Sequence, residues 1–124
     1  MDKKKILIID DEIEMVEMET MRLRGAGYEV QAAYDAHSGL QKAREWAPTL
    51  IILDIMLPQM DGYQVCYALK RDPQCQDIPI ILVSAIDEKY DTDLGKNVRA
   101  DFYFTKPFEP AVLLAKIKEL LHGK

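Results

Sequence analysis

Short apolar runs alternate along the chain with longer segments that mix apolar and charged residues. The strongest runs lie at 6–9, 50–53 and 79–83, and weaker ones lie at 29–33 and 101–104. Uninterrupted apolar runs of this length are typical of strands buried on both faces, as in a parallel sheet. The pattern therefore predicts five strands.

The segments between these runs have helical composition and are long enough to cross from one parallel strand to the next. They predict helices at 12–25, 37–46, 62–71, 88–98 and 109–122. Gly25 and Gly27 mark the end of the first helix, and Asp35 or Ser38 caps the second. Strands and helices thus alternate along the whole chain, which predicts an α/β fold.

The first, fourth and last helices differ in how clearly they show an apolar face. In the first, Glu19 and Arg22 fall inside any stripe drawn through its methionines, and we interpret Met15, Met18 and Met21 as adaptable core. The segment 88–98 has few apolar anchors, so we predict that it is the least stable helix. The last helix has its apolar residues on one predicted face: Val112, Leu113, Ile117, Leu120 and Leu121.

Composition and charge narrow the function classes. The chain has 124 residues, 48% hydrophobic and 30% charged, which fits one globular domain spanning 1–124. Its net charge of −5 argues against direct nucleic-acid binding. Cys66 and Cys75 lack metal-binding spacing, and we interpret them as reduced thiols, Cys66 in packing and Cys75 in a loop. With no secretory leader and no apolar stretch of membrane length, we expect a cytoplasmic protein that does not contact a membrane.

Carboxylates stand where two of the strongest apolar runs end. Asp10 and Asp11 follow the first run, Asp54 follows the third predicted strand, and Lys106 comes just after the fifth. Ligands gather outside the carboxyl ends of parallel strands, so we expect these side chains to converge. Ionised carboxylates that close together require a proton or a cation, and oxygen ligands favour Mg²⁺. A lysine in the same pocket suits a phosphoryl group.

Taken singly, these residues have ordinary structural interpretations. Asp11 fits a helix N-cap, Ser84 a strand-end hydroxyl bonded to backbone, and Tyr103 a strand aromatic that packs on a neighbour. His37 and His122 lack a partner pattern, and we interpret both as surface residues. Only the combination of acids, hydroxyl and lysine favours a functional site.

Four segments in this order carry a family resemblance: IIDDE, LDIMLPQMDG, ILVSA and DFYFTKPF. Together they resemble the receiver (response-regulator) domain of bacterial two-component signalling, over essentially the whole chain. The resemblance implies a flavodoxin-like (βα)5 fold, with a doubly wound five-stranded parallel sheet in the order 2-1-3-4-5.

The resemblance implies a magnesium-dependent phosphorylation site. Asp54 matches the phosphoacceptor, Asp11 the direct Mg²⁺ ligand, and Asp10 an assisting acid that acts through a bound water. Asp54 itself and the backbone carbonyl of Met56 complete the protein's share of the metal shell.

Four further positions match the residues that sense the phosphoryl group in the family. Ser84 resembles the hydroxyl that bonds a phosphoryl oxygen, and Lys106 resembles the lysine that pairs first with the acceptor and then with the phosphate. The bond between Lys106 and Pro107 is typically cis in relatives, and Tyr103 matches the aromatic whose rotamer follows the switch.

The implied function is a phosphorylation-dependent switch that turns over no external substrate. It takes its phosphoryl group from a histidine kinase or a histidine phosphotransfer protein, and the face of the fourth helix, fifth strand and fifth helix then changes. A downstream effector protein or a fused output domain reads that change, and phosphorylation-dependent dimerisation is a possible outcome.

Two alternatives stay open. An aspartyl-nucleophile phosphohydrolase is disfavoured because Met56 stands where that chemistry needs a second acid. A pseudo-receiver that serves only as an interaction surface is disfavoured because no member of the set is missing. Met56 and Ile86 are apolar and do not orient a hydrolytic water, so we also predict a long-lived aspartyl phosphate.

Overall fold

The computed structural model describes residues 3–58, 60–85 and 100–123. Its sheet is parallel and has the strand order β2-β1-β3-β4-β5, as predicted. The five strands are β1 (Lys5–Ile9), β2 (Glu29–Ala33), β3 (Leu50–Asp54), β4 (Ile80–Ser84) and β5 (Phe102–Thr105). They agree with the predicted runs except for small shifts at the ends, which are the least certain part of a sequence-based assignment.

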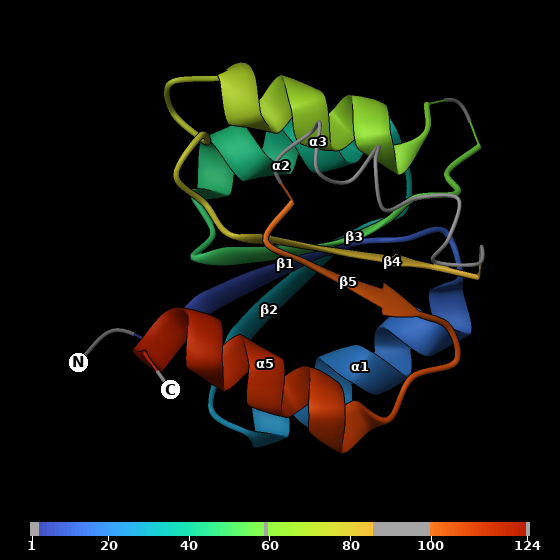
Figure 1. Ribbon diagram of the computed structural model, residues 1–124, viewed down its shortest axis with the longest axis vertical. Coiled ribbons are helices and arrows are strands. Elements are labelled where there is room, and N and C mark those ends of the chain that lie inside the picture. Colours follow the sequence, from blue (N-terminus) through green and yellow to red (C-terminus); the bar gives the residue numbers. More distant parts are fainter. Residues whose placement is uncertain (1–2, 59, 86–99, 124) are drawn as a thin grey trace.

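Helices cover both faces of the sheet, with α2 and α3 on one side and α1 and α5 on the other (Figure 1). Their bounds are Ile13–Gly25 for α1, Ala36–Trp46 for α2, Gly62–Arg71 for α3 and Pro110–His122 for α5. The helix predicted at 88–98 lies outside the described residues. This arrangement confirms the doubly wound α/β fold.

The starts of α2 and α3 have clear local causes. The Ser38 backbone N–H donates to Asp35 Oδ1 at 2.8 Å, so Asp35, not Ser38, caps α2. At α3, Asp61 and Gln64 form a capping box that satisfies two backbone donors reciprocally. Asp11 is not the N-cap of α1, because Glu12 occupies that position without a side-chain cap hydrogen bond.

The core has two halves, set by the alternation of side chains along the strands. Leu7, Ile51 and Leu82 belong to the half packed against α2 and α3. Their neighbours along the strands belong to the half that includes residues of α1 and α5: Ile6, Ile8, Leu50, Ile52, Ile81 and Val83. Every residue of β3 and β4 is buried, which explains why their sequences are apolar without interruption.

The methionines of α1 differ from the prediction. Met18 and Met21 are 52% and 74% exposed, while Val16, Glu19 and Leu23 are buried. The interpretation of Met18 and Met21 as core is therefore wrong, because a narrow stripe with the i, i+3, i+7 spacing is enough to seat α1 on the sheet. The carboxylate of Glu19 lies inside that stripe and pairs with Arg22 at 3.0 Å.

One smaller prediction is also corrected, and the structure adds detail to two others. Val112 is 52% exposed, because Leu113 and Ile117 alone form the fully buried part of the α5 stripe. Cys75 lies in the turn before β4, as predicted, and that turn folds its side chain into the core. His122 is on the surface as predicted, yet its Nε2 lies 3.2 Å from the Tyr28 hydroxyl.

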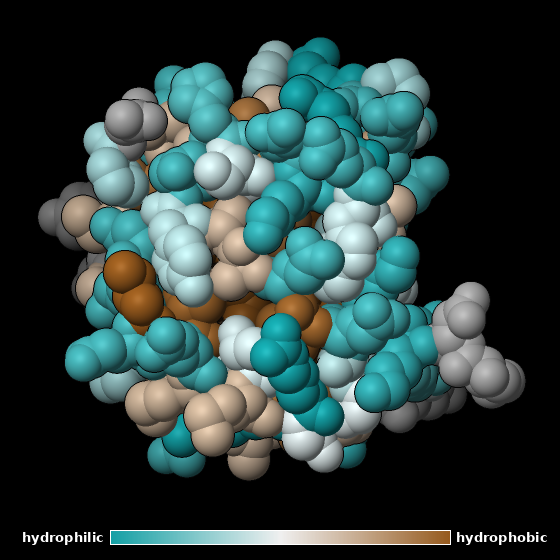
Figure 2. Space-filling view, turned by 180° about the vertical axis from the view of Figure 1, so that it is seen from behind, coloured by the Kyte–Doolittle hydropathy of each residue, from teal (hydrophilic) through white to brown (hydrophobic). Residues whose placement is uncertain are grey.

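The edge of the sheet at β2 is covered by cationic side chains. Arg24 donates to the Val30 carbonyl at 3.0 Å, and Lys42 donates to the Ala32 carbonyl at 2.9 Å. These bonds satisfy edge carbonyls that another strand would otherwise pair with. The face seen in Figure 2 is mostly hydrophilic, with apolar groups visible across its middle. Among the described residues, no helix is both long and apolar enough to cross a membrane.

Candidate functional site

Two buried carboxylates meet at the carboxyl ends of the central strands. Asp10 directly follows β1 and Asp54 ends β3, and they are 1% and 4% exposed. Each follows by two residues a side chain of the α1/α5 half of the core, Ile8 and Ile52, so the strand alternation directs both acids to the same side. The predicted convergence of Asp10 and Asp54 thus has a simple origin in strand geometry.

Lys106 reaches the same place from the loop after β5. Its Nζ lies 2.9 Å from Asp10 Oδ2, 2.5 Å from Glu12 Oε1 and 3.7 Å from Asp54 Oδ2. Its backbone N–H donates to the Ser84 carbonyl at 2.7 Å, which extends the pairing of β4 and β5. The peptide bond between Lys106 and Pro107 is cis. The structure therefore brings together Asp10, Asp54 and Lys106.

The electrostatics of the pocket leave Asp54 short of compensating positive charge. The pKa of Asp54 is raised from 3.8 to about 7, first by burial and then by the nearby charge of Asp10. Lys106 and the Met56 N–H, which donates to Asp54 Oδ1 at 3.2 Å, oppose that increase without overcoming it. A cation bound here would replace the missing positive charge.

The pKa of Lys106 is also raised, which favours the charged form of a lysine. Burial by itself lowers the pKa of Lys106, but its hydrogen bonds to Glu12 and Asp10 outweigh burial, and the pKa is raised. Lys106 is therefore a cation at neutral pH. It is held mainly by Asp10 and Glu12, with the Asp54 carboxylate beyond hydrogen-bond distance.

The acidic residues fit a hard divalent cation. Carboxylate oxygens of Asp10, Glu12 and Asp54 all lie within 4.8 Å of one another. All-oxygen donors, two of them from buried and mutually repelling acids, are the ligands that Mg²⁺ prefers. Asp11 is exposed and is not one of these three, although its charge contributes to raising the Asp54 pKa.

A close backbone approach fixes the loop that follows Asp54. The Gly62 N–H donates to the Ile55 carbonyl at 2.6 Å. A Cβ added to Gly62 would lie 2.4 Å from the Asp54 carbonyl oxygen and 2.6 Å from Ile55 Cα. Glycine is therefore required where α3 begins, because any side chain would push the backbone of residues 54–55 away.

Ser84 and Tyr103 lie on one face of the sheet. Tyr103 pairs in register with Leu82, and Ser84 follows Leu82 by two residues on β4. Ser84 is fully buried, whereas Tyr103 is partly buried against the α2/α3 half of the core. The arrangement places an aromatic side chain on the same face as the Ser84 hydroxyl, one strand away.

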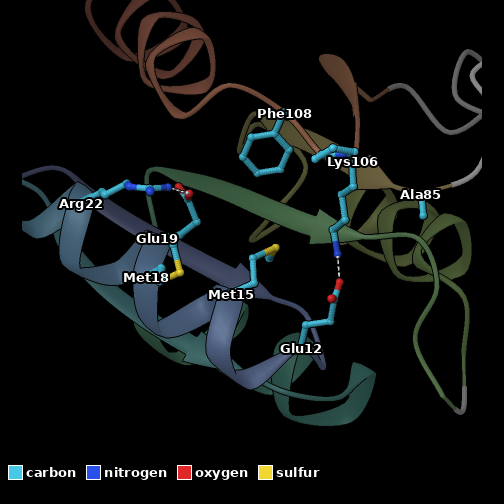
Figure 3. A pocket seen from close by; sticks show the side chains of 9 residues that line it. Glu12, Met15, Met18, Glu19, Arg22, Ala85, Lys106 and Phe108 are labelled. Atoms are coloured by element: carbon cyan, nitrogen blue, oxygen red, sulfur yellow. Dashed lines mark hydrogen bonds and ion pairs between the residues drawn. The ribbon is translucent and has the colours of Figure 1, made fainter.

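An apolar groove opens beside Lys106, between α1 and the segment that follows β5. Met15, Met18, Pro107 and Phe108 form its apolar walls. Figure 3 shows the ion pair of Lys106 with Glu12 at one end and that of Arg22 with Glu19 at the other. Asp11 and Met56 line a second cavity.

Glu12 is the site residue that the sequence did not reveal. It lies at the start of α1 and contacts Lys106, which is 94 residues away in the chain. The only local signal is that a third acid follows Asp10 and Asp11. An acid at that position is also favourable at a helix N-terminus, so the sequence does not separate the two roles.

Comparison with known proteins identifies relatives of this chain. The family model described as "Response regulator receiver domain" matches residues 6–118. The alkaline phosphatase synthesis transcriptional regulatory protein PhoP of Bacillus subtilis is 42% identical over 118 residues, which are 95% of this chain and 48% of PhoP. The DNA-binding dual master transcriptional regulator RpaA of Synechocystis is 41% identical over 117 residues, covering 94% of this chain and 48% of RpaA.

The chain thus spans about half the length of these curated relatives. Among solved structures, a CheY-like response regulator receiver domain protein from Methanospirillum hungatei matches with a TM-score of 0.92 and 32% identity. That match covers 98% of this chain and 96% of the other.

Proposed function

The chain belongs to the response regulator receiver domain family, and on that premise we propose that it is a signalling switch phosphorylated on Asp54. The observation that carries this proposal is the meeting of Asp10, Asp54 and Lys106 at the carboxyl ends of the sheet. The phosphoryl donor is a histidine kinase or a histidine phosphotransfer protein, and the cofactor is Mg²⁺.

Each residue has a defined task in the proposed transfer. A carboxylate oxygen of Asp54 attacks the phosphorus, a new O–P bond forms, and the P–N bond to the donor histidine breaks. The transition state spreads negative charge over the phosphoryl oxygens, so catalysis consists mainly of positioning and charge neutralisation. Lys106 supplies one positive charge at the pocket. A bound Mg²⁺, held by Asp54 together with Asp10, Asp11 and the Met56 carbonyl, would supply the rest.

The proposed switch uses a contact that only the phosphorylated state offers. The Ser84 hydroxyl donates to a phosphoryl oxygen once Asp54 is modified, and the space it leaves is filled by Tyr103 turning inward. Their placement on one face of neighbouring strands supports this coupling. A differential contact of this kind is what shifts a two-state equilibrium. We expect the face that includes β5 and α5 to change as a result.

The proposed partners follow from the length of the relatives. PhoP and RpaA are named as transcriptional regulators, and each is about twice as long as the matched segment. We infer that this domain acts through an output domain or a separate effector, and not by binding nucleic acid itself, since its net charge is −5. We also propose that phosphorylation drives dimerisation. Measuring the size of the protein with and without beryllofluoride tests this.

The phosphate on Asp54 is expected to be long-lived. Met56 is apolar and 56% exposed, so its side chain does not hold a water in line with the phosphorus. Ile86, the other residue behind this prediction, lies outside the described residues. Loss of phosphate within seconds from isolated phosphorylated protein in Mg²⁺ at neutral pH would refute it.

Labelling with acetyl phosphate tests the function. Wild-type protein with Mg²⁺ should gain the mass of one phosphoryl group, and Asp54→Asn should gain none. Asp77→Asn is the matched control. Asp77 is exposed and lies before the start of β4, at the amino ends of the strands, whereas Asp54 lies at their carboxyl ends. Equal labelling of wild type and Asp54→Asn would exclude Asp54 as the acceptor. No labelling and no beryllofluoride binding by the wild type would favour the pseudo-receiver.

A further inference from the structure

The ammonium of Lys106 is divided unequally among three carboxylates. It donates to Asp10 and to Glu12, while Asp54 Oδ2 is 3.7 Å away. An ammonium has three donors, and a contact of 3.7 Å is too long for a hydrogen bond. Two acids other than the acceptor therefore hold the lysine in this state.

Glu12 is placed differently from the two buried acids. Its backbone N–H donates to Asp10 Oδ1 at 3.0 Å, which fixes its position beside Asp10. Its side chain is 58% exposed and makes no cap hydrogen bond to α1. Figure 3 shows it extending from the start of α1 towards Lys106, across the end of the groove. The described contacts give the Glu12 carboxylate one partner, which is Lys106.

We propose that Glu12 is a positioning residue that retains Lys106 in the unphosphorylated state and competes with the phosphoryl group for its ammonium. This inference rests on the proposed function of Asp54. A phosphoryl group on Asp54 brings new anionic oxygens towards Lys106, and the lysine reaches them fully only by giving up a donor now held by Glu12. Because Glu12 contacts Lys106 in only one of the two states, it favours the resting state.

The expected size of the effect follows from the exposure of the two partners. Lys106 is 13% exposed and Glu12 is 58% exposed, so the pair is neither buried nor fully solvated. Removing one partner of an ion pair that is exposed to solvent changes an equilibrium constant by about two- to fivefold. Glu12→Gln should therefore tighten the binding of beryllofluoride by about two- to fivefold. It should also raise the initial rate of labelling by acetyl phosphate by a similar factor.

The experiment compares three variants with the wild type at saturating Mg²⁺. Glu12→Gln removes the charge and keeps the shape. Glu12→Asp keeps the charge but shortens the side chain by one methylene, so the direct contact with Lys106 is lost. Glu14→Gln removes an equal charge from the exposed first turn of α1, where no contact with Lys106 exists among the described residues. Beryllofluoride affinity is measured by calorimetry, and Mg²⁺ affinity is measured separately.

Tighter beryllofluoride binding by both Glu12→Gln and Glu12→Asp, with Glu14→Gln unchanged, supports the proposal. If Glu12→Gln binds beryllofluoride with unchanged or weaker affinity, the proposal is overturned. That result is expected if Glu12 has a purely structural or a metal-binding role. If Glu12→Asp binds beryllofluoride as tightly as wild type does, the negative charge at position 12 acts through space and not by direct contact with Lys106, and the proposal also fails. Wild-type protein that neither binds beryllofluoride nor accepts phosphate would instead refute the proposed function itself.

Discussion

Replacing Asp54 by asparagine should stabilise the metal-free protein, and the gain should depend on pH. Asp54 is 4% exposed, and burial together with the charge of Asp10 raises its pKa from 3.8 to about 7. Ionisation of Asp54 therefore lowers the stability of the folded state. Asparagine has nearly the same shape and does not titrate, so Asp54→Asn avoids the free-energy cost that wild type carries once the carboxyl of the unfolded chain has lost its proton.

The sign of the pH dependence follows from the two pKa values of Asp54. Below pH 3.8 the carboxyl is protonated in both the folded and the unfolded chain, so it contributes no difference. Between 3.8 and about 7 the folded protein keeps a proton that the unfolded chain has lost, and stability falls as pH rises. Above about pH 7 the carboxyl is ionised in both states, and this contribution to stability has been lost in full. The interval corresponds to about 4 kcal/mol at about 1.4 kcal/mol for each pH unit, which is a ceiling for the effect.

Urea unfolding in the presence of a chelator, followed by circular dichroism at several pH values, measures this difference. The free energy of unfolding of Asp54→Asn relative to wild type should grow between pH 4 and pH 7 and then level off. Asp77→Asn, at an exposed carboxylate, should show no such growth. Mg²⁺ should stabilise wild type much more than Asp54→Asn. A constant difference between the two proteins across the whole pH range would refute the argument.

Three other substitutions or reactions test the packing. Gly62→Ala should destabilise the fold by about 1 to 3 kcal/mol in urea unfolding, because its Cβ would meet the β3 backbone at 2.4 Å, whereas Gly25→Ala has open space and should be neutral or stabilising. Ile117→Ala, at a fully buried site, should lower the free energy of unfolding by about 2 to 5 kcal/mol, whereas Val112→Ala should change it by less than about 0.5 kcal/mol. Burial raises the pKa of Cys66 to about 11, so iodoacetamide should modify it slowly in native protein and rapidly in urea. Equal rates in the two conditions would contradict its burial.

The central strands β1, β3 and β4 were predictable because they are buried on both faces. An apolar run such as 50–53 leaves little choice of structure, and the helical segments between the runs require parallel crossovers. The convergence of Asp10, Asp54 and Lys106 then follows from topology, since the carboxyl ends of neighbouring parallel strands share one edge of the sheet. The order of the strands came from the family resemblance and not from the runs themselves.

The side-chain contacts were harder to predict, for reasons that differ by residue. Met18 and Val112 are apolar residues on the surface, and an apolar residue is a weak indicator of burial in a helix whose buried stripe is narrow. Cys75 lies in a polar turn that folds back onto the core, which depends on the backbone path and not on its neighbours in sequence. Glu12 acquires its role only when Lys106 arrives from the other end of the chain.

In the proposed switch, these geometries restrict which part of the site responds to phosphorylation. The backbone N–H of Asp10 is bonded to the Ala33 carbonyl, and Asp54 pairs in register with Val83, so the sheet holds both carboxylates at fixed positions. Lys106 has a long, flexible side chain, and its ammonium is shared between Asp10 and Glu12 without being fixed by the backbone of the sheet. In the proposed switch, a new anion on Asp54 would therefore act first by redistributing that ammonium. Because the Lys106 backbone N–H is bonded to the Ser84 carbonyl, the lysine proposed to sense the charge and the strand end that carries the Ser84 hydroxyl are directly connected.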